Sequence, residues 1–104
     1  MSTVAKILDS IQNKFNKEAA AGLEIVFQFK IDDTELFYLN VADQNCELGE
    51  GEHDDPSVTL IMDSETLSAI ATGELGGMQA FMTGKLTTEG NMMLATKLGD
   101  LFAI

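Results

Sequence analysis

Nine consecutive residues near the start of the chain alternate between apolar and mostly polar side chains. The apolar set occupies every second position and comprises Leu23, Ile25, Phe27, Phe29 and Ile31. Successive side chains of a β-strand point to opposite faces, so a period of two predicts a strand over 23–31 with one buried face. A half-buried strand needs a sheet around it, so this segment constrains the fold more than any other.

The residues before this strand have the period of a helix. One helical face collects Val4, Ile7, Leu8, Ile11 and Phe15. This spacing predicts an amphipathic helix over 4–15, and Gly22 is a natural stop for it.

Further strands follow at 34–41, 45–48, 58–62 and 85–88. Asp32 and Asp33 are expected to form a two-residue loop that joins the first two strands as an antiparallel hairpin. Apolar residues on both faces of 34–41 indicate a strand inside the sheet. The short, polar segment 45–48 is typical of an edge strand.

Helices are expected around the last strand. Asp63 is a suitable N-cap for a helix that runs to Thr72 and ends at Gly73. A short helix over 78–82 follows, and Asn91 starts a final helix. The element order is helix, four strands, two helices, strand, helix. We therefore expect an α+β fold with a mostly antiparallel sheet, in one domain over residues 1–104.

The charge of the chain excludes several functions. Seventeen acids face six lysines, and arginine is absent, which gives a formal net charge of −11. This charge repels phosphate backbones and anionic membranes, so we expect no nucleic-acid partner and no stable membrane insertion. No segment has the composition of a secretory signal or a transmembrane helix. Cys46 is the single cysteine, which is consistent with a reducing compartment. The cytoplasm is the expected location.

Catalytic and metal sites are not expected. His53 lies in an acidic loop, and one histidine is too few ligands for a zinc site. Cys46 has neither a Cys-x-x-C partner nor a histidine nearby in the sequence. No nucleophile, base and oxyanion donors occur together in a recognisable pattern. We therefore expect no catalytic residue, no metal and no cofactor.

Two blocks in the last third of the chain resemble the sterol carrier protein 2 family. They read Phe-Met-Thr-Gly-Lys-Leu over 81–86 and Gly-Asn-Met-Met-Leu-Ala over 90–95. The resemblance implies a five-stranded sheet, covered by helices on one face, that encloses an apolar cavity. It also implies a non-catalytic lipid-binding protein whose ligand is a fatty acid, a sterol-like molecule or another apolar lipid. The chain does not end in the peroxisomal signal that animal members often carry.

The candidate cavity wall combines inner-face residues of the first strand with residues of the two resembling blocks and the last helix. It comprises Ile25, Phe27, Phe29, Phe81, Met82, Met92, Met93, Leu94, Leu98 and Phe102. Methionine suits a pocket that accepts several ligand shapes, although it also fills ordinary cores. The phenylalanines on the sheet are compatible with either a packed core or a cavity wall. Without arginine, we expect an apolar grip and a polar lipid head near the opening.

Two functions remain open at this level. The first is a carrier that holds one lipid. The alternative is an accessory interaction module for an enzyme of quinone or fatty-acid metabolism. Family members of both kinds exist. The sequence also leaves open an enzyme partner or a homodimer.

Overall fold

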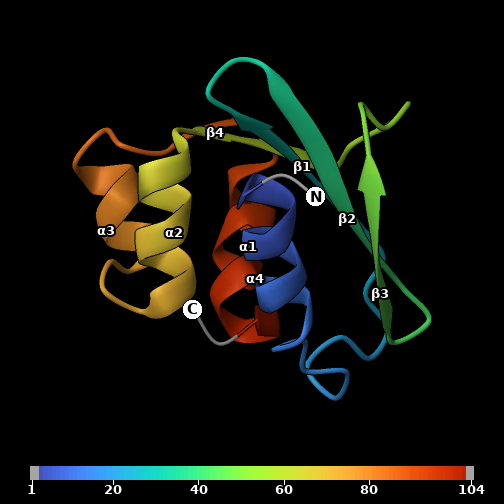
Figure 1. The fold of residues 1–104 in the computed structure, drawn as a ribbon. Helices are drawn as coiled ribbons and strands as arrows, with labels where there is room; N and C mark the ends of the chain where they lie inside the picture. The colour runs from blue at the N-terminus through green and yellow to red at the C-terminus, as the bar shows by residue number, and fades with distance from the viewer. Residues whose placement is uncertain (1–2, 103–104) are drawn as a thin grey trace.

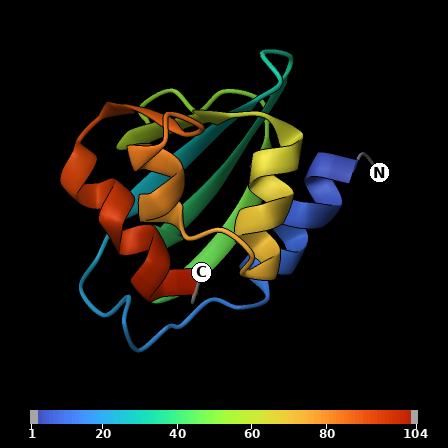
Figure 2. The same cartoon turned by 90° about the vertical axis from the view of Figure 1, so that its left-hand side faces the viewer.

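The computed structural model describes residues 3–102, in which four helices lie against one face of a five-stranded sheet (Figures 1 and 2). The predicted order of elements is confirmed. In chain order the elements are α1 (Thr3–Gln12), β1 (Ile25–Ile31), β2 (Glu35–Ala42), β3 (Asn45–Glu50), β4 (Val58–Met62), α2 (Ser64–Thr72), α3 (Gly77–Met82), β5 (Thr87–Gly90) and α4 (Met92–Phe102).

The strands are arranged in the order β3-β2-β1-β4-β5. Neighbouring strands are antiparallel except for β1 and β4, which are parallel. The sheet is therefore mixed but mostly antiparallel, as expected. β2 lies inside the sheet and β3 lies at an edge, which confirms both strand predictions. The parallel pair arises because the chain leaves edge strand β3 and enters the sheet again on the far side of β1.

The alternation in the first strand sorts its side chains as predicted. Ile25, Phe27, Phe29 and Ile31 are buried and share one face of β1. The helices cover that face, and Phe102 of α4 meets Phe27 edge to face at 6.2 Å between ring centroids. Burial of apolar surface at this interface is the main source of the fold's stability.

Both ends of α2 form as the sequence predicts. The carboxylate of Asp63 accepts a hydrogen bond from the Thr66 N–H at 2.7 Å, which caps the helix N-terminus. Gly73 ends the helix with a left-handed φ of 85°. Glycine adopts this conformation without the steric cost that a Cβ would add.

The first hairpin differs from the expected two-residue loop. Ile31 pairs with Glu35, so three residues, Asp32–Thr34, form the turn. Asp32 is held from the other side, because its N–H donates to Met62 O and its carboxylate accepts from Ser64 N. These bonds to the neighbouring strand and helix extend the turn by one residue.

Several element boundaries also differ from the prediction. β1 begins at Ile25 instead of residue 23, and β3 ends at Glu50 instead of residue 48. Hydrogen bonds account for the differences in α1 and β5. α1 ends at Gln12 instead of reaching Phe15, because Asn16 donates its N–H to Leu101 O and its side chain accepts from the N–H groups of Glu18 and Ala19. β5 begins at Thr87 instead of residue 85. The N–H groups at 85 and 86 both donate to Ala80 O at the end of α3, so they are not available to the sheet.

Candidate functional site

A cavity of about 470 Å³ lies between α3, α4 and the β4–β5 edge of the sheet. This volume falls within the range of small-molecule binding sites. The residues that line the cavity come from these four elements and from the residue just before β5. They are Leu60, Gly77, Met78, Phe81, Leu86, Thr88, Met92, Met93, Ala95, Thr96, Leu98 and Gly99.

Small side chains on α4 leave this space open. Met92, Ala95, Thr96 and Gly99 follow one another at the i, i+3, i+4 and i+7 positions of one helical face. Alanine and glycine on that stripe cannot fill the distance to α3 and β5. α3 faces them across the cavity and contributes Gly77, Met78 and Phe81.

The cavity has a buried floor and an exposed opening. Leu60, Leu86 and Leu98 are buried and form the floor. Met78, Met92 and Met93 also line the cavity but are largely exposed, so they lie at its opening. None of the described residues that line the cavity carries an ionisable side chain. The site therefore offers dispersion contacts and apolar burial, with threonine hydroxyls as the polar side-chain groups.

The structure brings four of the ten predicted wall residues into the lining: Phe81, Met92, Met93 and Leu98. Ile25, Phe27, Phe29 and Phe102 are instead packed in the core. The ring of Phe102 explains why these residues are packed. It contacts Phe27 and also Phe15, at 5.6 Å between the centroids of Phe102 and Phe15, and so fills the space between sheet and helices.

The two remaining predicted residues lie outside the lining. Met82 is 78% exposed, and Leu94 is half-buried against the core. Direct contact between these six residues and a ligand stays a prediction.

Sequence reasoning missed several lining residues that had a detectable signal. Leu86 and Thr88 are two apart, so they face the same way in a strand, and Thr88 pairs with Leu60 across β4 and β5. Ala95 and Gly99 carry small side chains, which the pattern of large apolar residues does not reveal. A stripe of small residues on an otherwise apolar helix is the pattern that would have identified them.

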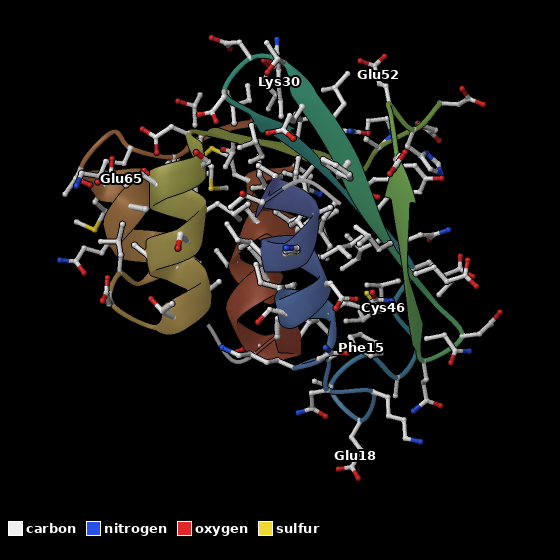
Figure 3. All side chains as sticks on the ribbon, in the orientation of Figure 1. Phe15, Glu18, Lys30, Cys46, Glu52 and Glu65 are labelled. Atoms are coloured by element: carbon white, nitrogen blue, oxygen red, sulfur yellow. The ribbon has the colours of Figure 1, made fainter. Side chains whose placement is uncertain are left out.

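Cys46 lies on β3 and faces α1, where the side chain of Gln12 donates to its carbonyl at 2.8 Å (Figure 3). Burial, with a smaller effect of Glu47, raises the pKa of the Cys46 thiol to about 12. The thiolate is the nucleophilic form of cysteine, so this thiol is unreactive near neutral pH.

His53 packs on the face of the sheet that lies away from the helices. Its ring packs edge to face on Tyr38 with centroids 5.1 Å apart, and its Nδ1 accepts from Asp55 N at 3.0 Å.

Residues 3–102 contain no group of three or more side chains placed to hold a metal ion. None of the helices in the described part of the chain has the length and apolarity that crossing a bilayer requires.

Comparisons with known proteins agree with this architecture. Hydroxysteroid dehydrogenase-like protein 2 of Danio rerio is 30% identical over 104 residues, which cover 97% of this chain and 25% of the relative. Peroxisomal multifunctional enzyme A of Dictyostelium discoideum is 32% identical, with 93% of this chain and 24% of the relative covered. The chain thus spans about a quarter or less of the length of such curated relatives.

Solved structures of the same fold include proteins of similar length. The solution structure of palmitated SCP2L2 from Aedes aegypti superposes with a TM-score of 0.75 at 26% identity, over 96% of this chain and 93% of that one. Sterol carrier protein 2 of Yarrowia lipolytica gives a TM-score of 0.70, also at 26% identity, over 98% and 94%. The SCP-2 sterol transfer family matches residues 4–103. The chain belongs to this family.

Proposed function

We propose that this protein is a non-catalytic lipid carrier that holds one apolar lipid in the cavity between α3, α4 and β5. The observation that supports it most directly is an apolar cavity without ionisable lining groups that opens between exposed methionines. The family supports lipid binding and transfer in general. The kind of lipid in the cavity, a fatty acid, a sterol-like molecule or another apolar lipid, is part of the proposal.

The energetics of such a site need no charged anchor. Burial of one methylene group gives about 0.8 kcal/mol, so about ten buried groups give about 8 kcal/mol before the cost of association. The lining has no acid or base to transfer a proton, which suits a carrier better than an enzyme. A charged lipid head finds no partner in the lining and is expected near the opening.

Two methionines provide a matched test. Met93 and Met82 are 77% and 78% exposed, but only Met93 belongs to the lining. We expect Met93→Ser to weaken the binding of dansylundecanoic acid about fivefold, because the lipid loses apolar contact at the opening. Met82→Ser changes the same residue type at the same exposure outside the lining, so a lipid that the lining alone holds should bind this variant as tightly as the wild type. Fluorescence titration measures both dissociation constants.

Mass spectrometry of the purified protein under native conditions gives an independent check. Lipid should be retained at up to one molecule per chain, and solvent extraction identifies it. A wild-type protein that neither retains lipid nor binds the fluorescent acid would refute the carrier function. Equal losses in the two methionine variants would refute this cavity as the site.

The second candidate is an accessory interaction module for an enzyme of quinone or fatty-acid metabolism. It is favoured by the relatives, in which the matching segment is only part of a longer chain. The test is affinity capture from the source cell at endogenous expression. A stoichiometric enzyme partner together with undetectable lipid binding would support it over the carrier. Both the carrier and the accessory-module proposals treat residues 1–104 as one lipid-binding domain.

The cytoplasmic location stays a prediction. The Dictyostelium relative is peroxisomal by its name. Imaging of the tagged protein in its own cell, with the tag placed at either end in turn, would distinguish the two compartments.

A further inference from the structure

The lining of the cavity contains one polar side chain whose oxygen has no partner. Thr88 Oγ1 is buried and makes no hydrogen bond within the described residues, and it is the one side-chain oxygen or nitrogen of that part of the chain in this condition. Thr88 lines the cavity between Leu86, two residues earlier, and Leu60, opposite on β4. Buried polar groups are nearly always hydrogen-bonded, so each exception calls for an explanation.

The stability of the fold does not explain why position 88 carries a hydroxyl group. Valine has the same shape as threonine, is at least as favourable in a strand and would suit a floor of leucines better. The other threonine of the lining behaves differently, since Thr96 Oγ1 donates to Met93 O at 2.6 Å within α4. Thr88 is therefore the lining hydroxyl whose O–H donor is still unused.

We propose that Thr88 binds an uncharged hydroxyl group of the lipid, so that the cavity prefers an alcohol to a hydrocarbon of the same length. This inference rests on the carrier function proposed above. A threonine hydroxyl both donates and accepts, as an alcohol does, so one hydrogen bond can form between the two groups whichever of them donates. A carboxylate is a poor match, because it is charged and the lining offers no cation to offset its desolvation.

Contact with the ligand needs one local movement. Thr88 Oγ1 is covered by protein atoms in the structure. Rotation about the Cα–Cβ bond exchanges the hydroxyl and the methyl group of threonine between staggered positions. The hydroxyl breaks no hydrogen bond when it turns.

The experiment compares three ligands of equal chain length: hexadecanol, hexadecane and palmitic acid, each used to displace dansylundecanoic acid. We expect Thr88→Val to raise the dissociation constant of hexadecanol about tenfold, as for the loss of one net hydrogen bond in an apolar site. The constants for hexadecane and palmitic acid should stay unchanged. Thr88→Ser, which keeps the hydroxyl, should retain the preference for hexadecanol.

Thr96→Val is the matched control, because it removes from the same cavity a hydroxyl whose donor is already used within α4. It should affect hexadecanol and hexadecane alike. Thermal unfolding adds a second readout. Thr88→Val should be at least as stable as the wild type, because no internal hydrogen bond is lost, so a variant that unfolds at a lower temperature would contradict the unpartnered state.

The outcomes separate this inference from the carrier function. Wild-type protein that binds the fluorescent acid and both neutral ligands, with no preference for the alcohol, overturns the role of Thr88 alone. An equal effect of Thr88→Val on hexadecanol and hexadecane does the same. A wild-type protein that fails to bind the fluorescent acid and all three ligands refutes the carrier function, and this inference with it.

Discussion

Gln28 shows how one side chain can fix a connection between strands. It is 2% exposed, on the face of β1 away from the helices. Its amide nitrogen donates to Phe37 O at 2.9 Å and Gly51 O at 3.0 Å, and its amide oxygen accepts from His53 N at 2.7 Å. The amide of Gln28 therefore ties the β3–β4 connection, which crosses this face, to the middle of the sheet. Backbone hydrogen bonds at Gly51 and Ser57 hold the two ends of the connection.

Replacement of Gln28 by leucine should lower the free energy of unfolding by about 2–3 kcal/mol. The change leaves backbone groups at three positions, one of them buried and two partly buried, without their side-chain partner. Urea denaturation followed by circular dichroism measures the loss. Gln79→Leu on the exposed surface of α3 is the control and should stay within about 0.5 kcal/mol of the wild type. A loss of that small size in Gln28→Leu would contradict the role given to the amide.

At the level of elements, α2 is defined by its caps more than by its length. It contains nine residues, and isolated helices that short are unstable in water. Asp63 caps one end, Gly73 ends the other, and Leu67 and Ile70 are buried against the core. Hydrogen bonds from the side chain and then the backbone of Thr66 lower the pKa of Asp63 below 3.8, and Lys85 adds a smaller favourable charge.

Asp63→Ala should cost about 1 kcal/mol of stability at neutral pH, the usual effect of losing an N-cap. The pH dependence has a defined sign. The folded-state pKa is lowered, so the contribution is present above pH 3.8 and disappears as the pH falls through the folded-state value. The difference between wild type and variant should therefore shrink in acid. Asp54→Ala in the exposed loop is the control, and an Asp63 effect that persists at low pH would contradict the capping account.

At the scale of the whole molecule, the charge is unevenly distributed. Residues 1–74 contain fifteen acids and four lysines, whereas residues 75–104 contain two of each. The net charge of −11 thus belongs to the part of the chain before α3, and the part that builds most of the cavity is balanced. Lys30, Glu52 and Glu65 point outward in Figure 3, away from the space between sheet and helices. Repulsion among the acids opposes the compact state, and it also opposes association between molecules.

Added salt should therefore stabilise this protein. Raising sodium chloride from a few millimolar to physiological ionic strength screens the repulsion and should increase stability by about 1 kcal/mol, or about 4–8 °C in the unfolding temperature. Differential scanning calorimetry measures the shift. The effect should fade as the pH is lowered toward the isoelectric point of about 4.1. A midpoint that is independent of salt at neutral pH would show that the repulsion is already offset within the fold.

Periodicity was sufficient for the elements and their order, because the spacing of apolar residues is itself a property of local backbone geometry. The strand at β1, the caps of α2 and the edge position of β3 were all readable in this way. Boundaries were less accurate where a distant backbone group competes for a hydrogen bond. Leu101 O takes the N–H of Asn16 beyond α1, and Met62 O takes that of Asp32 in the hairpin turn.

The sequence by itself determined that apolar side chains of β1 face inward and that a methionine-rich segment lies at the end of the chain. Only the tertiary structure decided which of these side chains line a cavity and which fill the core. Phe27 and Phe29 satisfy the same pattern whether they meet another ring or a lipid, and the position of Phe102 decides between the two. The cavity depends on Ala95 and Gly99 of α4 lining the same space as Thr88 of β5. The apolar pattern of a single element cannot reveal such a space, because the space lies between elements.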